Sequence, residues 1–179
     1  MNRFGIEVSL LHAPKLDPDF LPLYKFNQAF LKDAKQPLGL AVERAGGEMA
    51  VCETFIHGTP EYREADRYYV NRIVKTMLWM KGGFRIYVRG SEDIYHAMQE
   101  DFSANGCQAF DWDYMANVFE HPFEVVLCDA LPAAKDSPKA IGRHLDGCRI
   151  GFDAGGSDRK VSAVIDGESV YSEEVVWFP

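Results

Sequence analysis

The hydrophobic positions of the chain fall into stretches with the spacing of strands and stretches with the spacing of helices. Residues 38–44 and 48–56 are rich in residues that favour strands, and Gly46 and Gly47 stand between them. Because glycine readily adopts the positive φ of a tight turn, the pattern predicts a β-hairpin. Residues 4–11 suit a further short strand, and a loop rich in proline follows them.

Helical spacing dominates the parts of the chain around this hairpin. Apolar residues predict one helix over 23–35 and a longer one that begins at Pro60, after a Thr59 cap, and ends at Gly82. Ser91 has the position of an N-cap for a helix over 94–102. Strands are expected over 84–88 and 123–128, the latter covered on both faces, and another helix over 133–145.

The end of the chain reads as a three-stranded meander, with strands over 148–153, 159–165 and 168–177. Its turns fall at 154–158 and at 166–167. The whole order predicts an α/β fold with a mixed sheet flanked by helices. We expect an accessory α/β domain over 1–147 and a separate segment over 148–179.

Composition narrows the classes of protein that the chain can belong to. Of its 179 residues, 47% are hydrophobic, and the formal net charge is -8. An acidic chain lacks the electrostatic footprint of a nucleic-acid-binding protein, so no nucleic acid partner is expected. No stretch approaches the about 18 apolar residues of a membrane helix, and residues 1–10 do not resemble a secretory signal. We therefore expect a cytoplasmic protein with no membrane partner.

Other reactive side chains give weaker indications. The four cysteines contain no CxxC pair, so buried free thiols are expected rather than a zinc site, and the five histidines are isolated. The aromatic and acidic run from Asp111 to Tyr114 suits either a platform for a sugar or a loop anchored by Trp112. We favour the loop.

The chemistry concentrates in the first turn of the predicted meander, at Asp153, Gly155, Gly156, Ser157 and Lys160. Glycines let backbone N–H groups approach an anion without interference from a Cβ atom, and the serine and lysine add a hydroxyl and a positive charge. A carboxylate at a strand end can hold a hydrated divalent cation that bridges phosphates. The alternative is that the glycines only turn the chain.

The wider run, residues 150–157 continued by Lys160 and residues 163–168, resembles the first phosphate loop of the actin, Hsp70 and sugar-kinase superfamily. Within it, the run is most similar to the ROK family of bacterial sugar kinases and repressors. The resemblance covers about residues 148–177. It implies a ribonuclease H-like fold (the actin and hexokinase type), ATP and Mg²⁺ as cofactors, and phosphoryl transfer to a sugar.

By the family pattern, Asp153 lies near the metal ion and the γ-phosphate. The same pattern implies that phosphate oxygens are cradled by Gly155, Gly156 and Ser157. The family often has a basic residue where this chain has Asp158, and a carboxylate there opposes phosphate binding unless it turns away or Lys160 compensates.

The family's catalytic Asp, zinc motif and adenosine site lie downstream of this loop, and none is recognisable in the chain. We therefore expect the N-terminal portion of a sugar kinase homologue, with a sugar as substrate or effector of the full-length protein. The alternative is a sugar-responsive transcriptional regulator, whose N-terminal extension would be a basic winged helix-turn-helix. A third hypothesis makes the accessory domain a non-catalytic homo-oligomer that assembles without nucleotide.

Overall fold

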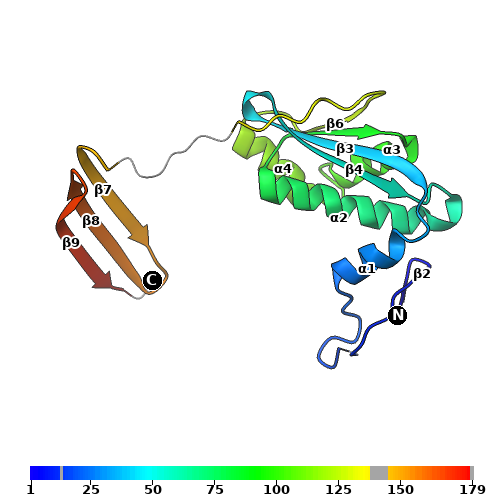
Figure 1. Ribbon diagram of the computed structural model, residues 1–179, viewed down its shortest axis with the longest axis horizontal. Helices are drawn as coiled ribbons and strands as arrows, with labels where there is room; N and C mark the ends of the chain where they lie inside the picture. Colours follow the sequence, from blue (N-terminus) through cyan, green and yellow to red (C-terminus); the bar gives the residue numbers. More distant parts are fainter. Residues whose placement is uncertain (13, 138–144, 178–179) are drawn as a thin grey trace. The chain divides into compact units, whose positions relative to one another are not determined.

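The structure is a computed structural model that describes residues 1–12, 14–137 and 145–177. The chain divides into two compact units, Met1–Ser137 and Pro138–Pro179 (Figure 1). The first unit holds a mixed sheet with helices packed on it, so the expected α/β class is confirmed. Among the helices of the described ranges, none combines the length and the apolar character that a membrane crossing requires.

The first unit is organised around a four-stranded sheet. Its strands are β3 (Gln36–Arg44), β4 (Glu48–Ile56), β5 (Arg85–Arg89) and β6 (Glu124–Leu127), in the order β4-β3-β5-β6. β3 pairs antiparallel with both of its neighbours, and β6 runs parallel to β5. The predicted hairpin is confirmed, and Gly46 and Gly47 take positive φ values of 75° and 66° in its turn.

Four α-helices complete the unit: α1 (Leu23–Phe30), α2 (Arg63–Lys81), α3 (Glu92–Asp101) and α4 (Ala109–Phe119). α2 packs against β3 and β4, and α3 packs against α2 and β6 (Figure 1). The core between these layers includes the fully buried Leu40, Ile86 and Leu78. Burying one such side chain stabilises the fold by about 1.5–3 kcal/mol, so this layer contact holds the unit together.

The opposite face of the sheet carries polar side chains that bond across the strands. Glu43 accepts hydrogen bonds from Arg85 Nη1 at 2.8 Å and from the hydroxyl of Tyr87 at 2.7 Å. Arg85 Nε also donates to Glu124 at 2.6 Å, which joins β3, β5 and β6. The bond from Tyr87 and the guanidinium of Arg85 outweigh partial burial and lower the pKa of Glu43.

Near the N-terminus the structure differs from the expectation of one strand over 4–11. The chain forms two short strands, β1 (Asn2–Arg3) and β2 (Ile6–Glu7), that pair antiparallel. Phe4 and Gly5 make the turn between them with positive φ values of 55° and 82°. The strand prediction was wrong because an apolar Phe4 occupies a turn position.

Two expectations in the second half of the first unit were also wrong. The loop expected at Asp111–Tyr114 lies within α4, where Asp111 is buried. β6 is an edge strand with its residues half-buried or exposed, not a strand covered on both faces. Of the helix expected over 133–145, residues 138–144 lie outside the described residues, and Lys135 forms a β-bridge with Met49.

The second unit contains the predicted meander, built from β7 (Cys148–Ala154), β8 (Asp158–Ile165) and β9 (Glu168–Val176). Asp166 and Gly167 turn the chain with positive φ values of 47° and 88°, as a tight hairpin requires. None of its described side chains is buried, so both faces of this sheet are open.

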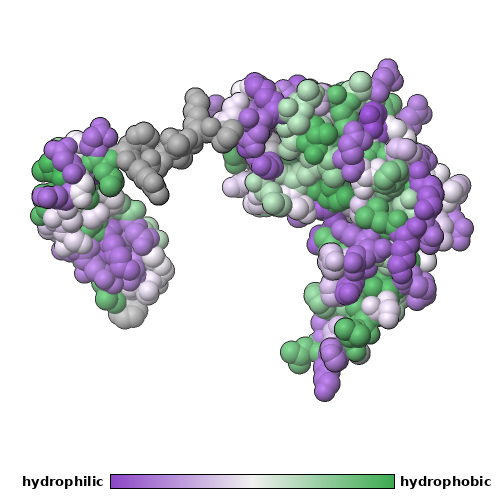
Figure 2. Space-filling view, in the orientation of Figure 1, coloured by the Kyte–Doolittle hydropathy of each residue, from purple (hydrophilic) through white to green (hydrophobic). Residues whose placement is uncertain are grey.

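Cross-strand pairing divides the meander into a polar and an apolar face, because directly opposed residues lie on the same side of a sheet. Asp153, Lys160 and Glu174 are paired in one row, and Ile150, Ala163 and Tyr171 in a row of the other face. Figure 2 shows hydrophilic side chains gathered over the middle of the meander on the side in view.

The Ser91 cap predicts a measurable contribution to stability. Its Oγ accepts a hydrogen bond from the backbone N–H of Ile94 at 3.2 Å. We expect Ser91→Ala to lower the free energy of unfolding by about 1 kcal/mol in urea denaturation. Thr59→Ala is the matched control, since Thr59 precedes a helical turn without a capping bond, and its effect should stay below about 0.5 kcal/mol. Equal losses for both variants would contradict the assignment.

Candidate functional site

The turn between β7 and β8 brings the residues of the predicted phosphate site together. Asp153 is the penultimate residue of β7, and its cross-strand partner in β8 is Lys160. Gly155, Gly156 and Ser157 connect the two strands, and the last two of them are exposed. The five predicted residues therefore lie on one exposed turn and the strand ends beside it.

Trp177, at the end of β9, fixes the carbonyl groups of this turn. Its indole Nε1–H donates to the oxygen of Gly155 at 3.0 Å, and its backbone N–H donates to the oxygen of Ser157, also at 3.0 Å. Within the part of the chain that the structure describes, no acceptor is bonded to the N–H of Gly155, Gly156 or Ser157. The turn thus presents three consecutive N–H groups that are not bonded to any described residue.

Gly155 and Gly156 differ in the space that a side chain would have. A Cβ atom on Gly155 would lie 2.7 Å from Oδ1 and 2.9 Å from the backbone oxygen of Asp158, too close for any other residue. A Cβ atom on Gly156 would meet no described atom within 4 Å, and this residue does not have a positive φ. The described part of the chain therefore gives no steric reason for glycine at 156.

The charges beside the turn neutralise one another in part. Lys160 Nζ lies 3.2 Å from Oδ2 of Asp158 and 3.7 Å from Oε1 of Glu174. The hydrogen bond to Asp158, with the negative charges nearby, raises the pKa of Lys160. Asp158, the residue that departs from the family pattern, is thus ion-paired with Lys160 and turned toward Gly155.

A metal ion at Asp153 would have few ligands from the protein. The described residues contain no group of three or more His, Cys, Asp or Glu side chains that could hold one. Mg²⁺ usually keeps several waters and binds through one or two carboxylates together with substrate phosphates. A single exposed carboxylate does not make a closed structural metal site, so Mg²⁺ at Asp153 would take its other ligands from water and phosphate.

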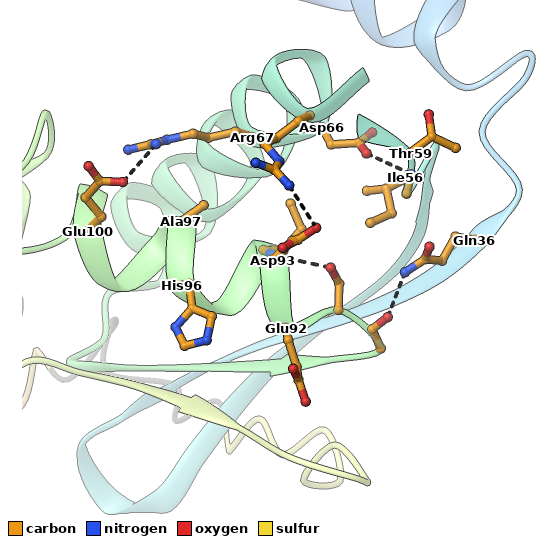
Figure 3. A pocket seen from close by; sticks show the side chains of 15 residues that line it. Gln36, Ile56, Thr59, Asp66, Arg67, Glu92, Asp93, His96, Ala97 and Glu100 are labelled. Atoms are coloured by element: carbon orange, nitrogen blue, oxygen red, sulfur yellow. Dashed lines mark hydrogen bonds and ion pairs between the residues drawn. The ribbon is translucent and has the colours of Figure 1, made fainter. Parts of the chain in front are cut away.

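The first unit contains a hollow of about 590 Å³ between the starts of α2 and α3 (Figure 3). Gly58 and Thr59 border it before α2, and Gly90 and Ser91 border it before α3. No sequence motif had pointed to this hollow. The sequence signal was a glycine followed by a threonine or serine ahead of each of the two helices. The threonine and serine were interpreted only as helix caps.

The charged groups around this hollow bind one another. Asp66 is buried and accepts hydrogen bonds from the backbone N–H groups of His57 and Gly58 at 2.9 and 2.8 Å. Arg67 Nη1 pairs with Glu100 at 2.9 Å across the gap from α2 to α3 (Figure 3). These contacts place the two helices, so Asp66, Arg67 and Glu100 have a structural role at the hollow.

Asp101 is the buried centre of a second set of contacts behind the hollow. It binds Arg67, Nδ2 of Asn71 at 2.8 Å and the thiol of Cys107 at 3.2 Å. Burial by itself raises the pKa of Asp101, but the hydrogen bonds from these three groups outweigh it and the pKa is lowered. The carboxylate is therefore ionised in the folded protein and ties α2 to α3 and to the loop after it.

The cysteines differ from the expectation of buried thiols. Cys107 and Cys148 are exposed, while Cys52 and Cys128 are half-buried, and all four are free. Cys107 lies outside the core because its thiol donates to Asp101 from a loop, and Cys148 starts a strand of the open meander. Neither position could be inferred from cysteine spacing.

No model of a known protein family matches this chain, and no curated protein matches it.

The Asp101 contacts predict how stability depends on pH. A carboxyl with a lowered folded-state pKa adds stability that is present above its unfolded pKa and is lost as the pH falls through the folded value. We expect Asp101→Asn to be about 2 kcal/mol less stable than the wild type at pH 7, and to lose less on acidification below about pH 4. Urea denaturation from pH 2 to 7 measures both effects.

Glu100→Gln is the matched control, because it removes an exposed partner of the same arginine. Its cost should be below about 1 kcal/mol. An Asp101→Asn variant that keeps the wild-type pH profile would contradict the assignment.

Proposed function

We propose that residues 148–177 form the phosphate-binding opening of the nucleotide lobe of a ROK-type sugar kinase homologue with a ribonuclease H-like fold. The observation that carries the proposal is the set of free backbone N–H donors at Gly155, Gly156 and Ser157. Three such donors on a turn suit the terminal oxygens of ATP, which are the most highly charged acceptors on a nucleotide.

The side chains around the turn have complementary roles in this proposal. Gly156 leaves the approach to the amides open, and the hydroxyl of Ser157 adds a donor. Asp153 would hold hydrated Mg²⁺ against the phosphates, and bound Mg²⁺ supplies the positive charge that offsets charge on the phosphoryl group during transfer. Lys160 keeps the carboxylate of Asp158 from opposing the nucleotide.

The proposal gives these residues a role in binding and not in proton transfer. The proposed reaction is phosphoryl transfer from ATP to a sugar hydroxyl, and no described residue of this chain is assigned as the general base. Residues 1–147 act as an accessory α/β domain. ATP and sugar phosphates are cytoplasmic metabolites, so we place the protein in the cytoplasm.

The charge of the first unit favours a kinase homologue over a transcriptional regulator. α3 and α4 are consecutive helices, as in a helix-turn-helix, but α4 carries Asp111 and Asp113 and no Lys or Arg. A recognition helix needs basic side chains near phosphates, since phosphate contacts supply most of the affinity for DNA. An acidic second helix does not suit that role.

The proposal predicts a local response to nucleotide at the turn. In ¹⁵N NMR titrations of this chain with MgATP, the amide signals of Gly155, Gly156 and Ser157 should shift first and furthest. AMP, which lacks the terminal phosphates, should leave them in place. Shifts spread evenly over the chain, or no shifts at these three amides up to 10 mM MgATP (about 2.7 kcal/mol of binding free energy at 1 M standard state), would overturn the proposal.

Gly156→Ala separates ligand binding from folding at the same turn. The added methyl has open space, so the free energy of unfolding should be unchanged or slightly raised. It obstructs the anion, so MgATP affinity should fall about tenfold, or about 1.4 kcal/mol. Ser172→Ala, an exposed change on β9, is the control that should affect neither quantity.

The ion pair beside the turn predicts opposite effects of its two members. Asp158→Asn removes a carboxylate near the phosphates and frees Lys160, so MgATP affinity should rise severalfold at low salt. Lys160→Ala leaves Asp158 unpaired and should lower affinity severalfold. The double variant should return toward the wild type if the two charges act through each other. Changes of the same sign for both single variants would contradict this role.

A further inference from the structure

The outer surface of α2 and α4 carries a cluster of exposed aromatic residues that the proposed function does not use. Trp79, Phe110 and Tyr114 lie with ring centroids 5.4–6.3 Å apart and their planes within 18° of parallel. Their exposed fractions are 49%, 67% and 43%, and Met80 and Val118 extend the patch at 76% and 55%. We call these five residues the aromatic face.

The aromatic face is held rigidly from below. The indole N–H of Trp79 donates to Asp111 at 2.7 Å, and Lys75 binds the same buried carboxylate at 2.8 Å. The indole of Trp79 is thus fixed in place, and the rings of Phe110 and Tyr114 stack beside it. Rigid, exposed Trp and Tyr side chains are typical of the centres of protein interfaces, where little conformational entropy is lost on association.

A hollow of about 310 Å³ lies beside the rings on α2. It is lined by Leu23, Arg72, Lys75, Thr76, Trp79 and Met80. Phe110 is the most exposed ring of the face and protrudes from the first turn of α4. The surface therefore has both an apolar projection and an apolar recess, which is what a surface that pairs with itself requires.

The exposed charges on α2 and α4 indicate which kind of partner the aromatic face binds. On α2, Arg72 is exposed and its guanidinium has no ion-pair partner among the described residues. On α4, the carboxylate of Asp113 is exposed and equally unpaired within the described ranges. One helix of the face thus offers a free positive charge and the other a free negative charge.

We propose that the aromatic face is the contact surface between two copies of this chain, related by a two-fold axis. In such an isologous contact each residue pair occurs twice. Arg72 of one copy lies against Asp113 of the other, and Phe110 of each fills the recess beside Trp79 of its partner. A partner of a single charge would leave one of these two side chains unpaired.

Sedimentation of the full chain tests the proposal. The wild type should form a dimer at micromolar concentration. Phe110→Asp, which places an acidic residue in the first turn of α4 and so suits the helix dipole, should fold and weaken association by about 30-fold or more. Leu16→Asp, at a fully exposed apolar position outside the face, is the matched control and should sediment as the wild type.

Charge reversal identifies the partner as a second copy. Arg72→Asp and Asp113→Arg should each sediment as monomers, because each brings like charges together twice. An equimolar mixture of the two variants should restore the dimer, because every pair is then of opposite sign. Lys32→Asp, a reversal of an exposed charge on the loop after α1, is the control for net charge.

Three results would overturn the proposal. These are a wild-type chain that stays monomeric at 100 µM, a dimer that Phe110→Asp leaves intact, and single charge variants whose mixture does not reassociate. The first would assign the face to a different partner, and the second would place the dimer contact elsewhere on the chain. The third would show that Arg72 and Asp113 do not pair across the contact.

Discussion

The need to satisfy backbone hydrogen bonds governs where this chain can bind a ligand. A buried or partly buried N–H group without an acceptor is costly, so folded proteins pair nearly all of them. The first unit does so with side chains at its loop and helix starts. Asp66 accepts from the N–H groups of two loop residues, and Ser91 accepts from Ile94. The turn of the second unit is largely exposed. Its N–H groups have no partner among the described residues, whereas the carbonyls of Gly155 and Ser157 accept from Trp177.

Two glycine pairs that look alike in the sequence differ in their structural role. Glycine pairs occur at residues 46–47 and at residues 155–156, each between strands. In the first pair both φ values are positive, so the glycines are needed to turn the chain. In the second pair neither φ is positive, and Gly156 has open space where a side chain would be. The first pair serves the fold. In the second pair, Gly155 is required by its close contact with Asp158, and only Gly156 lacks a steric reason within the described chain.

Local patterns predicted the elements whose ends depend on nearby residues. The β3–β4 hairpin, the meander and α3 with its cap are set by turn residues and by spacing within each element. α4 was missed because its position depends on Asp111, which bonds to Lys75 and Trp79 more than thirty residues earlier. A carboxylate in an aromatic run suggests an exposed loop until its buried partners are known.

Contacts between residues far apart in the sequence also limited what could be predicted about the candidate site. Its residues were identified because they are close together in the sequence, but Trp177 was not, since it lies 22 residues beyond Gly155 and has no motif of its own. The pairing of Lys160 with Asp158 and Glu174 likewise depends on the register of three strands. A glycine-rich pattern can indicate which backbone amides an anion could reach. Only the fold shows which side chains and strands fix the conformation of that turn.

The geometry of the turn therefore depends on the whole meander and not on the glycine run alone. Two hydrogen bonds from Trp177, directly after β9, hold the turn that joins β7 to β8, so all three strands must be paired for the turn to keep this conformation. The polar row of Asp153, Lys160 and Glu174 crosses the same strands and places charge beside those donors. A change that shifts β9 by one residue would move Trp177 to the other face of the sheet, and the carbonyls of Gly155 and Ser157 would lose their partner without any change in the turn's own sequence.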